Sequence, residues 1–302
     1  MMKILSLLPS ATEIVYFLDL ENELEGVTHE CNWPPDATSK PVVSTTSLSL
    51  DENMSAGEID RIVGEKMTLG EPLYRLDEQL IRTIQPELIL AQDLCHVCAV
   101  PSGQVTDALD KLGCDAEVIS LDPSTVGEIL DGIDQVARRA GGNASAVDGL
   151  RARVVAIRHA TESLEPVPAL ALEWSDPPFV GGHWVPEMVE IAGGRDVLGA
   201  VGKRSERVEW THIAEAAPET IVFMPCGYFL DDTIEQAEGL YDIEAFASTP
   251  AARAGNVFAV DASSYFSRPG PRVVDGIEIL AWILHPDEFP EPPGGRVVRV
   301  AR

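Results

Sequence analysis

The segment Leu80-Ile-Arg-Thr-Ile-Gln-Pro-Glu-Leu-Ile-Leu90 joins an amphipathic helix to a buried strand through a Pro-Glu break. The same order of features returns in the second half of the chain, in Ile213-Ala-Glu-Ala-Ala-Pro-Glu-Thr-Ile-Val-Phe223. Proline ends a helix because it has no backbone N–H and restricts the residue before it. A helix that leads into an apolar strand is the repeating unit of α/β sheets. The repeat therefore predicts two α/β halves built on one plan.

Short apolar runs alternate with helical patterns through the first half, which predicts βαβ units and a mostly parallel sheet. The expected strands are Lys3–Leu8, Glu25–Thr28, Val42–Val43, Leu88–Ala91 and Glu117–Ile119. The expected helices are Ala11–Leu18, Asp77–Ile84 and Gly103–Leu112. The first of these strands is not taken as a secretion signal, because Pro9 and polar residues follow it and a small-residue cleavage site does not.

The middle of the chain has two helical patterns and no strand signal. They cover Ser124–Ala140 and Ala144–Thr161. The alternation then restarts, with strands expected at Ala169–Leu172, Thr220–Met224 and Val257–Val260, and helices at His183–Ala192, Thr211–Ala216, Thr233–Ala237 and Val273–Leu284. We therefore expect an N-terminal α/β lobe at residues 1–122, a bridging helical segment at 123–165 and a C-terminal α/β lobe at 166–302, with Rossmann-like, mostly parallel sheets in both lobes.

The charge of the chain excludes some partners. Its 302 residues include 49 acidic and 22 basic side chains, a formal net charge of −27 at pH 7. So acidic a surface repels nucleic acid, and no apolar run approaches the roughly 20 residues of a membrane-spanning helix. Arginines outnumber lysines 17 to 5, and an acidic, lysine-poor surface predicts a salt-rich, halophilic host. The lack of secretion and lipid-attachment signals predicts a cytoplasmic location.

The cysteines allow three interpretations. The chain has five cysteines, and this odd number does not favour a disulfide framework. Cys95 and Cys98 form a Cys-x-x-Cys pair, and Cys31 on a neighbouring loop would complete a thiolate-rich metal site. The alternatives are a redox dithiol and inert buried thiols. A redox dithiol usually precedes a helix N-terminus, which lowers the pKa of its thiols, and no such helix is expected directly after this motif.

Ligands of open α/β sheets bind at the carboxyl ends of the strands, so the residues just past each strand are the candidate site. In the first half these are Pro9, Ser10, Trp33, Pro34 and Asp93. In the second half they are Glu173, Trp174, Phe179, His183, Trp184, Tyr228, Tyr265 and Phe266. Aromatic residues make up only 6% of the chain yet gather in these loops. Large rings beside a few polar groups predict a broad, flat, mostly apolar small-molecule ligand.

Sequence signatures of catalysis are missing, so no catalytic residues are predicted. The chain lacks Gly-x-Ser-x-Gly, the P-loop, Gly-x-Gly-x-x-Gly and His-Glu-x-x-His. Glu173 and Asp93 are candidate acid and base, but no spacing pairs them. Gly181-Gly182-His183 opens an expected helix, where it would either hold an anion or make a structural turn.

Leu7-Leu-Pro-Ser-Ala-Thr-Glu-Ile14, followed by Glu30-Cys-Asn-Trp-Pro-Pro35, resembles the opening of the helical-backbone substrate-binding proteins of cobalamin and iron-chelate importers. The resemblance runs from Lys3 to about Leu284. It implies one ligand between two lobes, held without bond-making, and it is nearest to the cobalamin-binding members. Cobalamin or a related corrinoid is thus the expected ligand. By position the resemblance implies that Pro9, Ser10, Trp33, Pro34, Trp174, Phe179, Trp184 and Tyr265 lie in binding loops.

Two departures from this family stand out. Its members present a surface glutamate to the permease, near the start of the helix before the Pro-Glu strand. Counting back from the two prolines reaches Gln79 and Thr211, with Glu78 and Glu209 close by, so docking to an ABC permease is doubtful. A segment from about 51 to 72 also has no counterpart. A metal-dependent or thiol enzyme, and an iron-chelate importer component, stay open as alternative functions.

Overall fold

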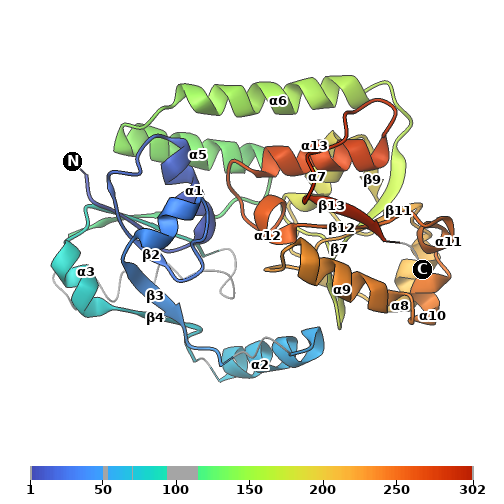
Figure 1. Ribbon diagram of the computed structural model, residues 1–302, viewed down its shortest axis with the longest axis horizontal. Coiled ribbons are helices and arrows are strands. Elements are labelled where there is room, and N and C mark those ends of the chain that lie inside the picture. The colour runs from blue at the N-terminus through green and yellow to red at the C-terminus, as the bar shows by residue number, and fades with distance from the viewer. Residues whose placement is uncertain (1, 50–53, 70, 94–114, 301–302) are drawn as a thin grey trace. The chain divides into compact units, whose positions relative to one another are not determined.

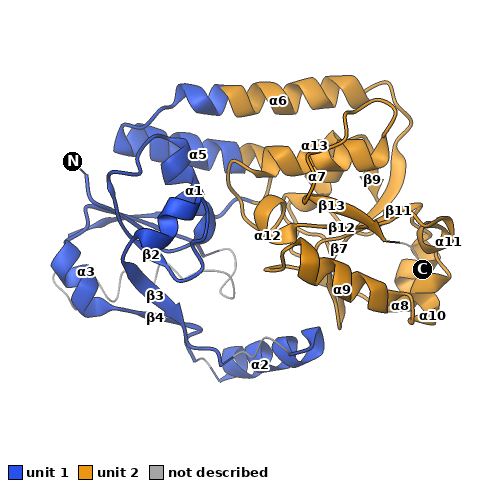
Figure 2. Cartoon of the chain, viewed as in Figure 1, with its two compact units in different colours: residues 1–123, 129–148 blue, residues 124–128, 149–302 orange. Residues whose placement is uncertain are grey.

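The computed structural model describes residues 2–49, 54–69, 71–93 and 115–300, whose course is drawn in Figure 1. They form two compact units (Figure 2). Unit 1 comprises residues 1–123 and 129–148, and unit 2 comprises residues 124–128 and 149–302. The helix expected at Gly103–Leu112 lies outside the described residues. The expected three-part division of the chain stays a prediction.

Unit 1 is built on one sheet of short strands. Its elements are β1 (Ile4–Ser6), α1 (Pro9–Phe17), β2 (Leu24–Thr28), the 3-10 helix η1 (Pro35–Ser39), β3 (Val42–Thr46), α2 (Ala56–Thr68), β4 (Tyr74–Leu76), α3 (Glu78–Ile84), β5 (Leu88–Ala91) and β6 (Glu117–Ser120). Within the described residues the strand order is β4-β3-β2-β1-β5-β6, parallel except for the β3–β4 pair. The order changes direction at β1, so the carboxyl ends of β1 and β5 form the switch point where ligands of such sheets bind.

The alternation of side chains along each strand explains the core of unit 1. Alternate residues point to opposite faces of a strand, and on one face Leu5 and Ile89 pack with Ile81 of α3. Val63 of α2 lies against the same cluster. Helix α2 was not expected from the sequence, although Ser55 and Glu58 form a complete capping box at its start. It accounts for much of the segment that lacked a family counterpart.

Unit 2 has a larger sheet. Its elements are β7 (Val167–Ser175), β8 (Pro178–Val180), α7 (Val185–Ile191), β9 (Gly194–Asp196), β10 (Glu206–Arg207), α8 (Trp210–Ala216), β11 (Thr220–Phe223), α9 (Leu230–Leu240), α10 (Glu244–Ala247), α11 (Pro250–Ala254), β12 (Val257–Val260), α12 (Ala262–Tyr265), α13 (Val273–Leu284) and β13 (Val297–Val300). The order is β10-β8-β7-β11-β12-β13, with β9 also paired to β7. Helices α7 and α13 lie on one side of this sheet and α8 and α9 on the other (Figure 1).

Both units are α/β, which confirms the fold class expected from the sequence. The second sheet is mixed, because β7–β8, β8–β10 and β12–β13 are antiparallel pairs. The β7–β8 hairpin turns at Asp176-Pro177, and β13 returns beside β12 from the proline-rich tail. The expected helix His183–Ala192 is shorter than predicted, since α7 begins only at Val185, with a proline in its first turn.

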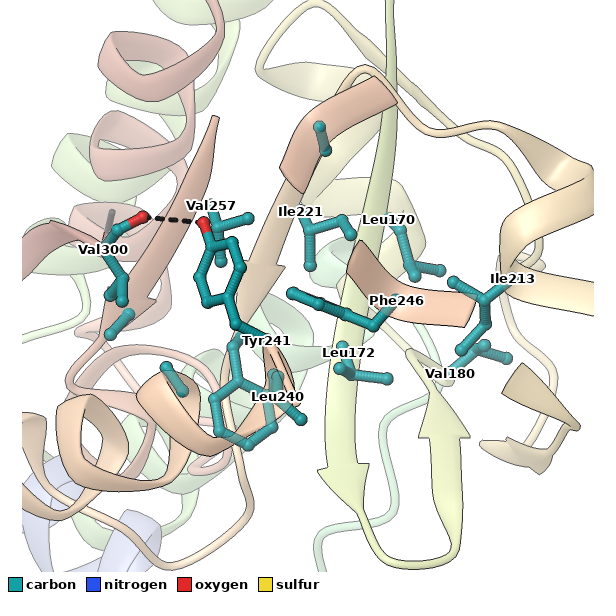
Figure 3. Packing of buried hydrophobic residues seen from close by; sticks show 14 residues of the cluster. Leu170, Leu172, Val180, Ile213, Ile221, Leu240, Tyr241, Phe246, Val257 and Val300 are labelled. Atoms are coloured by element: carbon teal, nitrogen blue, oxygen red, sulfur yellow. Dashed lines mark hydrogen bonds between the residues drawn. The ribbon is translucent and has the colours of Figure 1, made fainter. Parts of the chain in front are cut away.

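The apolar centre of unit 2 surrounds Phe246, which is fully buried. Its ring meets those of Tyr241 and Trp210 edge to face, with centroids 5.4 Å and 5.9 Å away. Figure 3 shows Phe246 beside Leu170 and Leu172 of β7. The Tyr241 hydroxyl donates a 3.0 Å hydrogen bond to the Val300 carbonyl, which satisfies its one polar group. This core holds the strands whose ends carry the candidate loops.

Two long helices belong partly to each unit. Helix α5 (Val126–Ala140) starts in unit 2 and continues in unit 1, whereas α6 (Ser145–Thr161) starts in unit 1 and continues in unit 2. In unit 2, Glu187 accepts a 2.7 Å hydrogen bond from the Val126 N–H and thereby caps the start of α5. Among the described helices, none has the length and apolar character to cross a membrane.

Replacing Gly149 with alanine is expected to raise the free energy of unfolding by about 0.5–1 kcal/mol, because glycine within a helix costs that much relative to alanine. Gly149 lies inside α6, and an added Cβ there would meet no atom within 4 Å. Urea unfolding measures the change. As the contrasting variant, Gly142→Ala would place a Cβ 3.0 Å from the Leu18 carbonyl oxygen and is expected to destabilise. Equal effects of the two substitutions would contradict the prediction.

Candidate functional site

The loop after β1 turns directly into α1. Pro9 occupies the first helical position, where its missing N–H leaves no donor unsatisfied. Both Pro9 and Ser10 are buried, Ser10 with only 2% of its surface exposed. The two predicted contact residues therefore lie beneath the surface of this loop, and we assign them to its support.

A hydroxyl and thiol cluster ties this loop to the next one. The Thr12 hydroxyl lies 2.8 Å from Ser6 Oγ and 3.1 Å from Cys31 Sγ, and Thr28 Oγ1 lies 3.2 Å from the same sulfur. Cys31 is buried, with 4% of its surface exposed. It thus joins α1 to the segment after β2, a role that the sequence alone did not reveal.

The segment after β2 presents Trp33 at the surface. Its side chain is 45% exposed, a large exposed area for so apolar a ring. The Trp33–Pro34 peptide bond is cis, and Pro34 is half-buried. Of the residues predicted from this half of the chain, Trp33 is the one best placed to contact a ligand.

Asp93 lies just past β5 in a network at the end of the sheet. Its N–H donates to Asp122 Oδ1, and its Oδ2 accepts a 3.2 Å hydrogen bond from Ser120. Gln92 is buried beside it and donates to the Leu121 carbonyl at 3.0 Å. These bonds hold the ends of β5 and β6 together, so Asp93 positions backbone at the switch point of unit 1.

In unit 2, Glu173 is engaged by the surrounding backbone. Its Oε1 accepts the Gly182 N–H at 3.2 Å, and its Oε2 accepts the hydroxyl of Ser205. A carboxylate that accepts two hydrogen bonds within the protein is a fixed structural group. This arrangement gives no support to Glu173 as a general acid or base.

Three rings gather at the carboxyl ends of β7 and β11. Trp174 and Tyr228 lie with ring centroids 5.5 Å apart and planes tilted by 33°. Phe179 faces Trp174 in the antiparallel β7–β8 register. All three are partly exposed, and the Trp174 indole N–H is satisfied by the Asp176 carbonyl at 3.1 Å. The arrangement offers an apolar aromatic surface, as predicted for a flat ligand.

The Gly181-Gly182-His183 turn is locked by its own neighbours. The N–H groups of the three residues donate to the carbonyl of Ala171, the carboxylate of Glu173 and the carbonyl of Lys203. None of the three donors is left for an anion, so the turn is the structural alternative of the two predicted. The sequence hinted at this packing only through Gly199 and Gly202 in the facing loop.

Gly182 allows that packing because it has no side chain. A Cβ added there would lie 2.1 Å from the backbone nitrogen of Ser205. His183 follows with φ +51°, in the left-handed region that costs energy for residues other than glycine. Burial lowers the pKa of its imidazole, and the nearby Arg204 lowers it further. The ring is therefore neutral near pH 7.

Acidification is expected to destabilise unit 2 through His183. Because the folded pKa lies below the ordinary 6.5, the unfolded chain takes up a proton first, and stability falls as the pH drops from 6.5 toward the folded value. Between about pH 7.5 and about pH 5.5, the native protein should lose more stability in urea unfolding than His183→Asn. His212→Asn, on the exposed surface of α8, serves as the control. Equal losses of stability in the native protein and in His183→Asn would refute the assignment of this pH dependence to His183.

Trp184 and Phe266 lie inside unit 2. They are 6% and 1% exposed, and the Trp184 indole donates a 2.9 Å hydrogen bond to the Phe266 carbonyl. Both were predicted to contact the ligand, and their burial assigns them instead to the support of the loops. Tyr265 is half-buried, with the guanidinium groups of Arg272 and Arg296 at 5.7 Å and 5.0 Å from its ring centre. Burial raises the pKa of its hydroxyl.

The predicted thiolate metal site is not assembled in the described part of the chain. Cys95 and Cys98 lie outside the described residues, and Cys31 is held by threonine hydroxyls. Within the described residues, no three His, Cys, Asp or Glu side chains lie together as a metal would require. Cys226 is exposed beside Tyr228.

The family model that matches this chain is that of the periplasmic binding protein, and it spans residues 4–263. The chain therefore belongs to the periplasmic binding protein family, a class of substrate-binding proteins for small molecules. This confirms the resemblance seen in the sequence. An uncharacterized ABC transporter substrate-binding lipoprotein of Bacillus subtilis (strain 168), YvrC, is 21% identical over 301 residues, covering 96% of this chain and 82% of YvrC.

Solved structures share the fold. The periplasmic vitamin B12 binding protein BtuF of Vibrio cholerae matches with a TM-score of 0.67 and 22% identity, over 93% of this chain and 96% of BtuF. A periplasmic heme binding protein from Pseudomonas aeruginosa matches with a TM-score of 0.71 and 18% identity, over 99% of both chains. At such identities the likeness establishes the fold and leaves the choice of ligand open.

Two expectations need correction. The cytoplasmic location is wrong, because the matched family is periplasmic and the relatives are a lipoprotein and periplasmic proteins. The doubt about an ABC permease is likewise unsupported, since YvrC is itself an ABC transporter substrate-binding protein. Glu78 is the first residue of α3 and Glu209 directly precedes α8, and both are exposed.

Proposed function

We propose that this protein is the substrate-binding component of an ABC importer and that its substrate is cobalamin or a related corrinoid. The observation that carries the proposal is the aromatic surface formed by Trp174, Phe179 and Tyr228 in unit 2. In unit 1, taken by itself, Trp33 is an exposed ring in the segment after β2. A corrin is broad, flat and apolar on its faces, so it gains most from several rigid rings.

Charge supports a corrinoid over a strongly anionic iron chelate. The chain carries a net charge of −27, and the acidic Glu173 directly precedes Trp174 in β7. Such surroundings repel a ligand with several carboxylates or catecholates. Cobalamin carries its polarity mainly as neutral amides at the rim of the ring. Arg272 and Arg296 lie near Tyr265, and Arg296 also pairs with Asp275 at 3.9 Å, which offsets positive charge that a polyanion would need.

Permease docking is the second half of the proposal. Glu78 is the first residue of α3 and Glu209 is the N-cap of α8, so each lies at the start of the helix that precedes a Pro-Glu strand. Exposed carboxylates at these helix starts suit recognition by arginines of a membrane partner. The double variant Glu78→Arg/Glu209→Arg reverses both charges. It should no longer stimulate transport by the permease, and its affinity for the ligand should be unchanged.

Titration of the purified protein with cyanocobalamin tests the ligand. A ligand that binds only the folded state stabilises it by mass action, by about 2.7 kcal/mol at 100 times the dissociation constant, and the midpoint temperature of thermal unfolding rises accordingly. Cobinamide, haem and a ferric siderophore provide the comparison. Stabilisation by haem or the siderophore with none by the corrinoids would reject the proposed substrate while keeping the family assignment.

We also propose that the acidic surface is adapted to high salt. Repulsion among the charges of a chain at −27 is screened as ionic strength rises. The free energy of unfolding should therefore increase between about 0.1 M and about 1 M potassium chloride. Urea unfolding at the two salt concentrations provides the measurement, and a flat or falling dependence would refute the adaptation.

A further inference from the structure

The Nε2 atom of His183 is buried and has no hydrogen-bond partner. In the described residues the only other buried side-chain polar atom of this kind is Ser44 Oγ, which lies within strand β3. Leaving such a group unpaired costs about 1–3 kcal/mol. The turn that carries this nitrogen is bonded through the Gly182 N–H to Glu173, the residue before Trp174, and an unpaired nitrogen there calls for a missing partner.

The backbone around His183 is held in place from several sides. Its N–H donates to the Lys203 carbonyl, and its own carbonyl accepts the Gly202 N–H at 2.9 Å. The close approach of Gly182 to Ser205 prevents the turn from relaxing. His183 keeps a left-handed φ of +51° under these constraints. Backbone strain that is maintained by its surroundings is typical of functional residues.

The chemistry of the imidazole ring limits which kinds of partner can bind it. A neutral imidazole offers a nitrogen lone pair, which binds transition metals such as cobalt and iron. The ring lies 5.8 Å from that of Trp184, which is itself fixed by its hydrogen bond to Phe266. His183 as a whole is partly exposed, whereas its Nε2 is buried, so ligation by Nε2 requires the ring to turn about its side-chain bonds.

We propose that His183 Nε2 is an axial ligand to the metal at the centre of the substrate. The proposal rests on the proposed function, because it takes a cobalt corrinoid as that substrate. When the protein binds aquocobalamin, the cobalt–water bond breaks and a cobalt–Nε2 bond forms from the imidazole lone pair. The water leaves as a neutral molecule, so the oxidation state of cobalt and the proton count are unchanged. A corrinoid with an exchangeable axial position is then preferred over one whose position is blocked.

Absorption spectra of aquocobalamin and cyanocobalamin with the protein test this ligation. Cyanide occupies the axial position firmly, so cyanocobalamin reports binding without ligation. Aquocobalamin should show a band shift that matches its complex with free imidazole. His183→Asn removes the ring and keeps a residue that tolerates a left-handed φ. The shift should vanish in this variant, and its affinity for aquocobalamin should fall about tenfold, the loss expected for one partner of a buried polar group.

Two controls separate the possible outcomes. His212→Asn removes an exposed imidazole from α8 and should keep the shift, and thermal unfolding of His183→Asn without ligand checks that the variant is folded. Tight binding of both cobalamins without a shift, or a shift that survives in His183→Asn, would overturn the ligation and leave the proposed function intact. Failure of both cobalamins to bind would overturn the proposed function. In that case the same variants are titrated with ferric haem: an absorption shift that is lost in His183→Asn supports metal ligation, and the lack of such a shift overturns it.

Discussion

Replacing Phe246 with alanine is expected to lower the free energy of unfolding of unit 2 by about 3–5 kcal/mol, the range for a buried phenylalanine. The loss combines the transfer of a fully buried ring with the cavity that remains. The edge-to-face contacts with Tyr241 and Trp210 are lost as well. Because a domain is stable by only about 5–15 kcal/mol, unit 2 should approach the limit of folding. Urea unfolding with hydrogen exchange of β11 measures the effect.

Phe229 is the matched control for this prediction. It is the same residue type in the same unit, and its ring is 41% exposed. Phe229→Ala should change the free energy of unfolding by no more than about 0.5 kcal/mol, as is usual for surface substitutions. If the two alanine variants proved equally stable, Phe246 would not be the centre of this core.

Trp174→Ala is expected to weaken cobalamin binding by about 30-fold. Buried aromatic anchors of a binding surface contribute about 2 kcal/mol or more when truncated, and each 1.4 kcal/mol corresponds to about a factor of ten. Trp174 carries this role because its ring lies beside Tyr228 and faces Phe179 across the hairpin. Isothermal titration calorimetry with cyanocobalamin gives the affinity directly.

Trp174→Phe provides the control, since it keeps an aromatic ring and should lose much less affinity. Thermal unfolding of both variants without ligand checks that β7 and β11 still pair. Native affinity in a folded Trp174→Ala protein would show that the ligand does not use this surface. The same result would weaken the proposed corrinoid function, which depends on these rings.

The fold was largely predictable from local patterns. The helix-Pro-Glu-strand segment at Leu80 and its repeat at Ile213 correspond to α3–β5 and α8–β11. The expected buried strand Leu88–Ala91 matches β5. Periodicity succeeds here because burial on both faces demands continuous apolar residues. It fails for β8, β9 and β10, which are two or three residues long and have too few positions for a pattern.

The sequence predicted which loops carry the candidate site residues, but not how each side chain lies. Topology places these loops at the carboxyl ends of parallel strands, where the rings of Trp174 and Tyr228 have centroids 5.5 Å apart. Position in a loop does not decide exposure, however. Trp184 and Phe266 are both buried, and the Trp184 indole N–H donates its hydrogen bond to the Phe266 backbone carbonyl. Glu173 is engaged by Ser205, a partner 32 residues away that no local pattern identifies.

The sequence by itself determined that this chain has two α/β halves, an acidic surface and aromatic loops after its strands, because these features depend on residue type and local period. It led to the wrong location, since the family to which the chain belongs is periplasmic. Only the tertiary structure decided that Gly182 packs on Ser205 and that His183 is left with an unpaired nitrogen. Such outcomes depend on contacts between segments that are distant in the sequence. At these contacts a glycine without a Cβ allows two backbones to approach, and one missing hydrogen bond leaves a buried polar atom unpaired.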